Sequence, residues 1–226
     1  MKKFAFYVSN QANIFILLLT FIRKSNFSDF KQVSFVFIDG DPSQELQDLC
    51  SAFGLKIIAK KLSVYPHKER GRVASDYISI LLDEYHIDFL FILCNKILSG
   101  PLLSKYHNRI INTHPAVLPS FKGAKAIDQA LAAKAFLLGL TVHFIDENLD
   151  AGIPILQTVR HHSFFKGDYM TVLGDSIIAI LQVMKWLSDD RISMNSGYAF
   201  VEGADYSSSR FIPALEELTL IRSVEN

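Results

Sequence analysis

An amide, an imidazole and a carboxylate are spaced along the middle of the chain in a way that suits chemistry on a carbonyl group. Asn112 and His114 end an apolar run, and Asp150 lies in the acidic loop after a later one. Residues two apart in a strand leave the same face, so the first two side chains would point the same way. Such a trio can orient a carbonyl, move a proton and set the tautomer of the imidazole. Spacing alone leaves a second interpretation open, in which Asn112 caps a turn, His114 is an ordinary loop residue and Asp150 belongs to a turn before Gly152.

Alternating strand and helix patterns must position these side chains. Short apolar runs predict strands, and apolar residues three and four apart predict helices. Strands are expected at 4–8, 32–39, 56–62, 89–94 and 109–112, and helices at 14–23, 43–53 and 73–86. This alternation predicts an α/β fold with a Rossmann-like, doubly wound, mostly parallel sheet. Ligands bind such sheets beyond the carboxyl ends of their strands, so the loops after the first, fourth and fifth strands are candidate sites.

The composition predicts one folded domain. The chain has 226 residues, 50% of them hydrophobic, with a mean hydropathy of +0.22. That supports a full core at a length typical of a single domain. We expect a catalytic domain over 1–187, with residues 188–226 as an extension packed on it. An apolar share of this size also permits a homodimer.

Charge and cysteine usage limit the kinds of partner and the cellular compartment that we expect for the chain. Lys plus Arg and Asp plus Glu number 23 each, which leaves no positive surplus to neutralise a nucleic acid. Cys50 and Cys94 lie in apolar contexts without metal-ligand spacing, so structural thiols in the cytoplasm are expected and no metal is predicted. The apolar run at 14–22 is too short to span a membrane, and no membrane partner is expected.

The central segment resembles the core of the folate-dependent formyltransferases, with a fold like that of phosphoribosylglycinamide formyltransferase. The resemblance rests on INTHPAVLPSFKG, on the TVHF strand and on the LDAG loop, within a stretch that extends from about Ile92 to Gln157. It implies transfer of a formyl group from N10-formyltetrahydrofolate to a primary amine of a small molecule. Asn112 would then stabilise the developing oxyanion, His114 would stabilise that charge and relay protons, and Asp150 would hold the imidazole.

The resemblance also implies binding residues. Backbone groups would bind the pterin, although Ile97 and Leu98 are equally well explained as core residues. Ser9, Asn10 and Gln11 follow the first strand, where enzymes of this kind bind a substrate phosphate. The implied folate contacts are Lys96, Ile97, Leu98, Ile145, Asp146, Glu147 and Asn148, and the implied acceptor contacts are Ser9, Asn10, Gln11, Lys122 and Gly123.

Two departures from the family pattern bear on the acceptor. The turn after the first strand, residues 9–13, lacks the glycines of a phosphate-binding nest. The later segment 174–181 is mostly apolar where a ribose-binding glutamate is expected. We therefore expect a nucleotide-linked amino sugar as acceptor, of the dideoxy-amino-sugar type used in cell-surface polysaccharides. Glycinamide ribonucleotide is the alternative, and a non-catalytic folate-binding module is the more remote one.

The length of the chain disfavours two other activities that occur in the family. Formylation of methionyl-tRNA and hydrolysis of the folate donor belong to enzymes with an additional domain, for which 226 residues leave no room. The aromatic residues of 197–215 would either stack on a nucleotide base or pack the extension against the sheet.

Overall fold

A computed structural model describes residues 1–9, 12–25, 27–94, 96–147, 150–164, 170–207 and 210–215. The chain forms two compact units, Met1–Ile111 and Asn112–Asn226. This boundary is a different division from the expected one after residue 187, which stays a prediction. Among the described residues, no helix is both long and apolar enough to cross a membrane.

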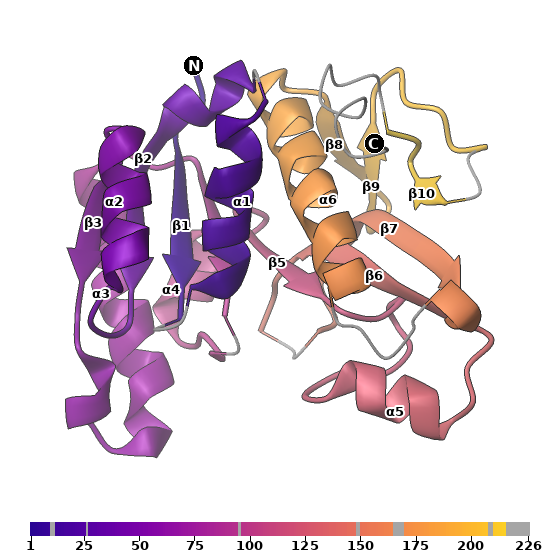
Figure 1. The fold of residues 1–226 in the computed structure, drawn as a ribbon, viewed down its shortest axis with the longest axis horizontal. Helices are drawn as coiled ribbons and strands as arrows, with labels where there is room; N and C mark the ends of the chain where they lie inside the picture. The colour runs from indigo at the N-terminus through magenta and orange to yellow at the C-terminus, as the bar shows by residue number, and fades with distance from the viewer. Residues whose placement is uncertain are drawn as a thin grey trace. The chain divides into compact units, whose positions relative to one another are not determined.

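The first unit alternates strands and helices as the sequence patterns predict (Figure 1). Its strands follow the order β4-β1-β2-β3 and pair in parallel. Because the chain adds β2 and β3 on one side of β1 and then β4 on the other, the unit is doubly wound. Its elements are β1 (Phe4–Val8), α1 (Asn13–Arg23), β2 (Val33–Ile38), α2 (Gln44–Ala52), β3 (Lys56–Ala59), α3 (Arg70–Glu84), β4 (Phe89–Leu93) and α4 (Pro101–Lys105), with 3-10 turns at Ser28–Gln32, Leu62–Val64 and His67–Glu69.

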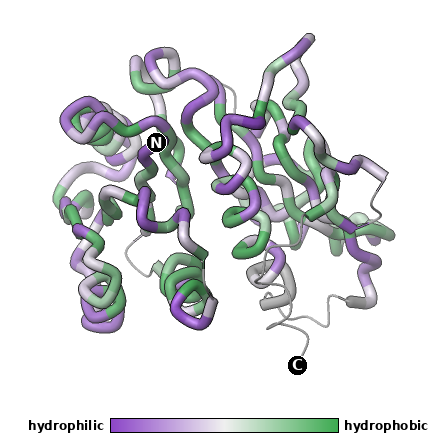
Figure 2. The backbone as a smooth tube through the Cα atoms, turned by 90° about the horizontal axis from the view of Figure 1, so that it is seen from above, coloured by the Kyte–Doolittle hydropathy of each residue, from purple (hydrophilic) through white to green (hydrophobic). Residues whose placement is uncertain are grey.

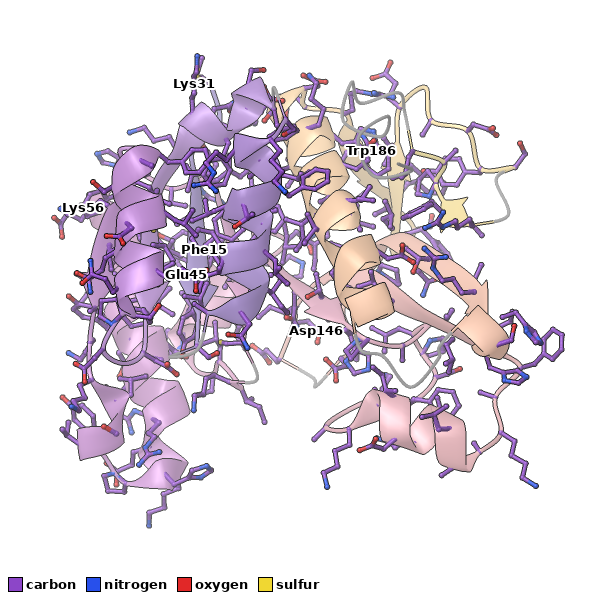
Figure 3. The ribbon with its side chains drawn as sticks, viewed as in Figure 1. Phe15, Lys31, Glu45, Lys56, Asp146 and Trp186 are labelled. Atoms are coloured by element: carbon purple, nitrogen blue, oxygen red, sulfur yellow. The ribbon has the colours of Figure 1, made fainter. Side chains whose placement is uncertain are left out.

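The core of the first unit forms around β1. All five residues of β1 are buried, as expected of a parallel strand covered on both faces. The ring of Phe6 lies 4.9 Å from that of Phe15 on α1 and 5.3 Å from that of Phe91 on β4, between ring centroids. Figure 3 labels Phe15 on its helix, and Figure 2 shows hydrophobic and hydrophilic stretches alternating along the backbone.

Local signals account for the ends of the helices. The hydroxyl of Ser43 accepts a hydrogen bond from the Leu46 N–H at 3.2 Å and so caps the start of α2. Gly54, at a φ of 62°, follows the helix end in the left-handed conformation that glycine adopts without strain. The third strand is shorter than expected, because the chain turns into a 3-10 helix at Leu62–Val64.

The second unit contains antiparallel strands. Its strands follow the order β10-β7-β6-β5, and β7 pairs antiparallel with both β6 and β10. The β8–β9 hairpin forms a separate sheet. The elements are β5 (Ile110–His114), α5 (Ala126–Ala132), β6 (Leu137–Phe144), β7 (Pro154–His161), a 3-10 turn (His162–Phe164), α6 (Met170–Ser188), β8 (Ile192–Asn195), β9 (Tyr198–Val201) and β10 (Phe211–Ile212).

An ion-pair cluster joins α6 to the C-terminal segment. Asp175, 3% exposed, accepts two hydrogen bonds of 2.6 Å from Arg160 on β7 and one of 3.0 Å from Arg210 next to β10. Burial raises the pKa of Asp175, and the Arg160 guanidinium opposes that shift. Trp186, labelled in Figure 3, is fully buried on the same helix.

Candidate active site

Strand β5 places Asn112 and His114 at its carboxyl end. The strand extends through His114 instead of ending at Asn112, so both residues follow strand geometry and leave the same face. The His114 side chain is 5% exposed. Asn112 is half-buried. The predicted relationship between these two side chains is therefore present in the backbone.

Both ring nitrogens of His114 face hydrogen-bond acceptors. Nδ1 lies 3.3 Å from Oδ2 of Asp150, and Nε2 lies 2.8 Å from the carbonyl oxygen of Phe121. Because a carbonyl oxygen only accepts, Nε2 carries a proton in this arrangement. A proton on Nδ1 as well gives a charged ring that donates to the carboxylate. An imidazole with acceptors at both nitrogens can hold a proton and pass it on.

Asp150 is held by the loop that follows β5. The Gly123 N–H donates to Asp150 Oδ2 at 2.8 Å, and the Asp150 side chain is 8% exposed. Asp150 has a φ of 47°, in the left-handed region that aspartate tolerates better than most residues. A Cβ on Gly152 would lie 1.8 Å from the carbonyl oxygen of Phe144, so only glycine lets the loop return this closely to β6.

A second histidine lies beside the same carboxylate. His143 is fully buried, and its Nε2 is 3.9 Å from Asp150 Oδ1. Its Nδ1 lies 3.0 Å from the Phe144 carbonyl oxygen and acts as the donor, which leaves Nε2 without a hydrogen-bond partner within the described residues. Burial lowers the pKa of His143, opposed by the Phe144 carbonyl and by Asp150. The structure makes His143 both a buried residue and a neighbour of the site.

Two polar side chains that the sequence analysis did not identify hold the loop after β5. The Thr141 hydroxyl donates to the Ala116 carbonyl at 2.7 Å and accepts the Leu118 N–H at 3.0 Å. Gln157 donates from Nε2 to the Leu118 carbonyl at 2.8 Å and to the Thr141 hydroxyl at 3.0 Å. These bonds fix the start of the loop that carries Phe121 and Gly123. Their only signal in the sequence is the TVHF motif, which contains Thr141.

The segment after β4 is positioned by α3. A Cβ on Gly71 would lie 2.3 Å from the Ile97 carbonyl oxygen, and the Ser75 hydroxyl accepts the Ser99 N–H at 2.9 Å. Ile97 is 65% exposed while Leu98 is 5% exposed. Leu98 is therefore a core residue, whereas Ile97 presents an apolar side chain to solvent.

Lys96, in the same segment, lies near a buried carboxylate. Its Nζ is 3.7 Å from Oδ2 of Asp39, whose side chain is 6% exposed. The Tyr7 hydroxyl, 3.5 Å from the same oxygen, comes from the end of β1. Burial raises the pKa of Tyr7 beyond its usual range, with Cys94 and Asp39 adding to the shift.

The remaining predicted binding residues differ in how far the structure describes them. Ile145 and Asp146 are half-buried and Glu147 is exposed in the loop after β6, where Figure 3 labels Asp146. Ser9 accepts the Ala12 N–H through its carbonyl oxygen at 2.9 Å. Lys122 is exposed. Gly123 donates to Asp150, as described above. Asn10, Gln11 and Asn148 lie outside the described residues.

His161 and His162 lie side by side at the end of β7. Consecutive residues of a strand point to opposite faces, which would separate the two rings if the strand continued. The ring centroids instead lie 4.3 Å apart, because β7 ends at His161 and His162 begins a 3-10 turn. Phe136 lies 4.5 Å from the His161 ring. Across the described residues, no group of three His, Cys, Asp or Glu side chains is arranged to hold a metal ion.

Comparisons with known proteins show which proteins this chain resembles. The chain is 44% identical over 110 residues to the human trifunctional purine biosynthetic protein adenosine-3, covering 48% of this chain and 11% of that protein. It is 29% identical over 159 residues to phosphoribosylglycinamide formyltransferase of Bacillus subtilis, covering 70% of this chain and 78% of the relative. The crystal structure of phosphoribosylglycinamide formyltransferase from Streptococcus pneumoniae superposes with a TM-score of 0.60 at 28% identity, covering 84% and 96% of the two chains.

The match to the trifunctional protein thus covers about a tenth of its length, whereas most of the Bacillus subtilis and Streptococcus pneumoniae proteins is matched. The family model of the formyl transferases matches residues 2–163. Because that match covers more than half of the chain, the chain belongs to the formyl transferase family.

Proposed function

We propose that this protein transfers a formyl group from N10-formyltetrahydrofolate to the primary amine of glycinamide ribonucleotide. The observation that carries the proposal is the pair formed by His114 Nδ1 and Asp150 Oδ2, 3.3 Å apart, with Asn112 on the same strand face as His114. The names of the relatives support this acceptor. They do not support the nucleotide-linked amino sugar expected from the sequence.

The donor supplies an electrophilic formyl carbon when it is bound. Residues of the chain would stabilise the developing charge and move the protons. The carboxamide of Asn112 donates a hydrogen bond to the carbonyl oxygen as negative charge develops on it. His114 would take a proton from the attacking amine and give one to the folate nitrogen as the bond between that nitrogen and the formyl carbon breaks. Asp150 holds the ring and stabilises its charged form.

Residues outside the trio fit a folate in chemical type. Ile97 offers an exposed apolar side chain beside backbone N–H and C=O groups, which suits a flat ring with amide-like edges. The backbone there is fixed by Gly71 and Ser75. We infer that the segment 96–98 and the loop 145–148 supply backbone contacts to the donor.

Ala12, directly before α1, lies in the left-handed backbone region that glycine usually adopts. Ala12 adopts a φ of 49°, and its N–H bonds to the Ser9 carbonyl at 2.9 Å. The first turn of α1 has no acidic residue and no side-chain cap. A helix N-terminus of this kind suits the phosphate of a ribonucleotide.

A nucleotide-linked amino sugar stays as a second candidate because of α6. Asp175, the carboxylate of segment 174–181, is buried against Arg160 and Arg210. Because both arginines bind this carboxylate, it is not available to accept a hydrogen bond from a ribose hydroxyl. An acceptor that makes no ribose contact at α6 would not need such a carboxylate.

The test is formation of tetrahydrofolate from N10-formyltetrahydrofolate in the presence of glycinamide ribonucleotide, a panel of nucleoside-diphosphate amino sugars, or buffer alone. Turnover on glycinamide ribonucleotide alone supports the proposal. Turnover on an amino sugar alone would replace it by the second candidate. Release without any acceptor would indicate hydrolysis, and donor binding without turnover would indicate a binding module.

The cytoplasm is our proposed compartment. Cys50 and Cys94 are both free thiols, and burial raises their pKa to about 11 and about 12. Thiols kept protonated by burial react slowly. This supports a structural role in a reducing compartment.

A further inference from the structure

An apolar cavity lies behind the histidine of the site, within the second unit. It occupies about 230 Å³ between the loop after β5, helix α5 and strands β6 and β7. Its walls include Val117, Phe121, Ala130 and Val159, and Ser120 supplies the one polar side chain of the lining. Among the residues that the structure describes, no charged side chain lines it. The cavity is therefore suited to an uncharged occupant.

The walls are held in place by backbone contacts. A Cβ on Gly139 would lie 1.9 Å from the Thr158 carbonyl oxygen and 2.9 Å from a methyl of Val117. The Thr141 hydroxyl is hydrogen-bonded to the Ala116 carbonyl and to the Leu118 N–H of the loop after β5. Because these bonds prevent the loop from moving onto β6, the space cannot close by a simple shift of side chains.

Size and access indicate the class of ligand. Apolar cavities of about 150 Å³ bind benzene in other proteins, and this one is larger. Leu137 lines the cavity and is 49% exposed, while Leu131 and Phe136 nearby in the chain are 46% and 70% exposed. A flat apolar molecule can therefore enter past hydrophobic side chains, and the Ser120 hydroxyl can bond one polar group on it.

The cavity wall is bonded directly to the catalytic imidazole. Phe121 lines the cavity, and its carbonyl oxygen accepts from His114 Nε2 at 2.8 Å. Two residues later, Gly123 donates to Asp150. A change in the position of Phe121 would alter the hydrogen bonding of His114.

We propose that this cavity is a binding site for a small uncharged aromatic molecule carrying one N–H or O–H group, and that its occupancy is transmitted to His114 through the Phe121 carbonyl. The site is distinct from the residues assigned to donor and acceptor. The proposal does not depend on which amine the enzyme formylates.

Indole is the probe, since it is flat, uncharged and has one N–H. Binding to the full chain is measured by titration calorimetry, and the His114 ring resonances are followed by NMR with ¹⁵N-labelled histidine. Ala130→Leu fills the cavity from α5. Ala132→Leu, on an exposed position of the same helix, is the matched control. We expect wild type and Ala132→Leu to bind alike, and Ala130→Leu to bind at least about 10-fold more weakly.

Val117→Phe fills the cavity from the opposite wall. It replaces Ala130→Leu in the binding measurement if that variant fails to fold. Indole-3-carboxylate should bind at least about 10-fold more weakly than indole, because its charge would be buried without a partner. Absence of indole binding to wild type, or wild-type affinity for indole in both filled variants, would overturn the site. Binding that leaves the His114 resonances unmoved would overturn the coupling.

Discussion

Oδ2 of Asp150 lies 3.3 Å from Nδ1 of His114 and receives the Gly123 N–H at 2.8 Å. One carboxylate oxygen thus joins the loop after β6 to the end of β5 and to the loop that follows β5. Because the other ring nitrogen of His114 is bonded to the Phe121 carbonyl, the imidazole is oriented from both sides.

Asp150→Asn should lower kcat by about 100- to 10,000-fold, because a neutral amide neither stabilises the charged ring nor selects its tautomer. Formyl transfer and thermal unfolding are both measured. Asp128→Asn, at an exposed position on α5, is the control and should retain the wild-type rate. A wild-type rate in Asp150→Asn would remove the carboxylate from the mechanism.

Asn112→Ala should lower kcat by about 100- to 1000-fold with little change in KM, because the amide is used when charge develops on the oxygen. Thr113→Ala is the matched control, since its side chain leaves the other face of β5. Circular dichroism should show both variants folded. An equal loss in both would indicate damage to the strand and not the removal of an oxyanion donor.

His143 should make stability depend on pH. Burial lowers its pKa in the folded chain, so between that value and the usual value of about 6.5 the unfolded chain binds the extra proton. The free energy of unfolding should therefore fall as pH decreases through and below about 6.5. Urea unfolding from pH 7.5 to 5 measures the slope, which His143→Gln should reduce. An unchanged slope would show that another group titrates.

Thr141→Val should destabilise the protein by about 2–4 kcal/mol, because it leaves the Leu118 N–H and the Ala116 carbonyl without their hydroxyl partner. Thr158→Val is the comparison, since its hydroxyl accepts the single Leu140 N–H bond at 3.2 Å. It should cost about 1 kcal/mol. Denaturant unfolding with unchanged m-values measures the loss in the free energy of unfolding for each variant. A larger loss in Thr158→Val than in Thr141→Val would contradict the role given to Thr141.

Gly71→Ala should raise the KM for the folate donor by about 10-fold or more while changing kcat less, because the new methyl would displace the Ile97 carbonyl. Ala74→Gly on the same helix removes a methyl instead and controls for helix stability. An unaltered donor KM in Gly71→Ala would exclude backbone of segment 96–98 from donor binding.

Much of the fold follows from local pattern. The run FAFYV has no polar position on either face, and it forms β1 with all five residues buried. Ser43 and Gly54 bound α2 by their own hydrogen-bonding and backbone preferences. The spacing of Asn112 and His114 identified their common face, because a strand has a period of two. Each of these features depends on residues within one turn or one strand.

The contacts that complete the site depend on segments that are distant in the chain. Phe121 and Gly123 act through backbone atoms, which every residue type carries, so no side-chain pattern marks them. Thr141 reaches the loop after β5 only because the fold brings β6 to it. Sequence alone therefore predicted which side chains could do the chemistry, and it indicated the strands and loops in which they lie. The tertiary structure decided which carbonyl and amide groups orient them, because those bonds form between backbone atoms that only folding brings together.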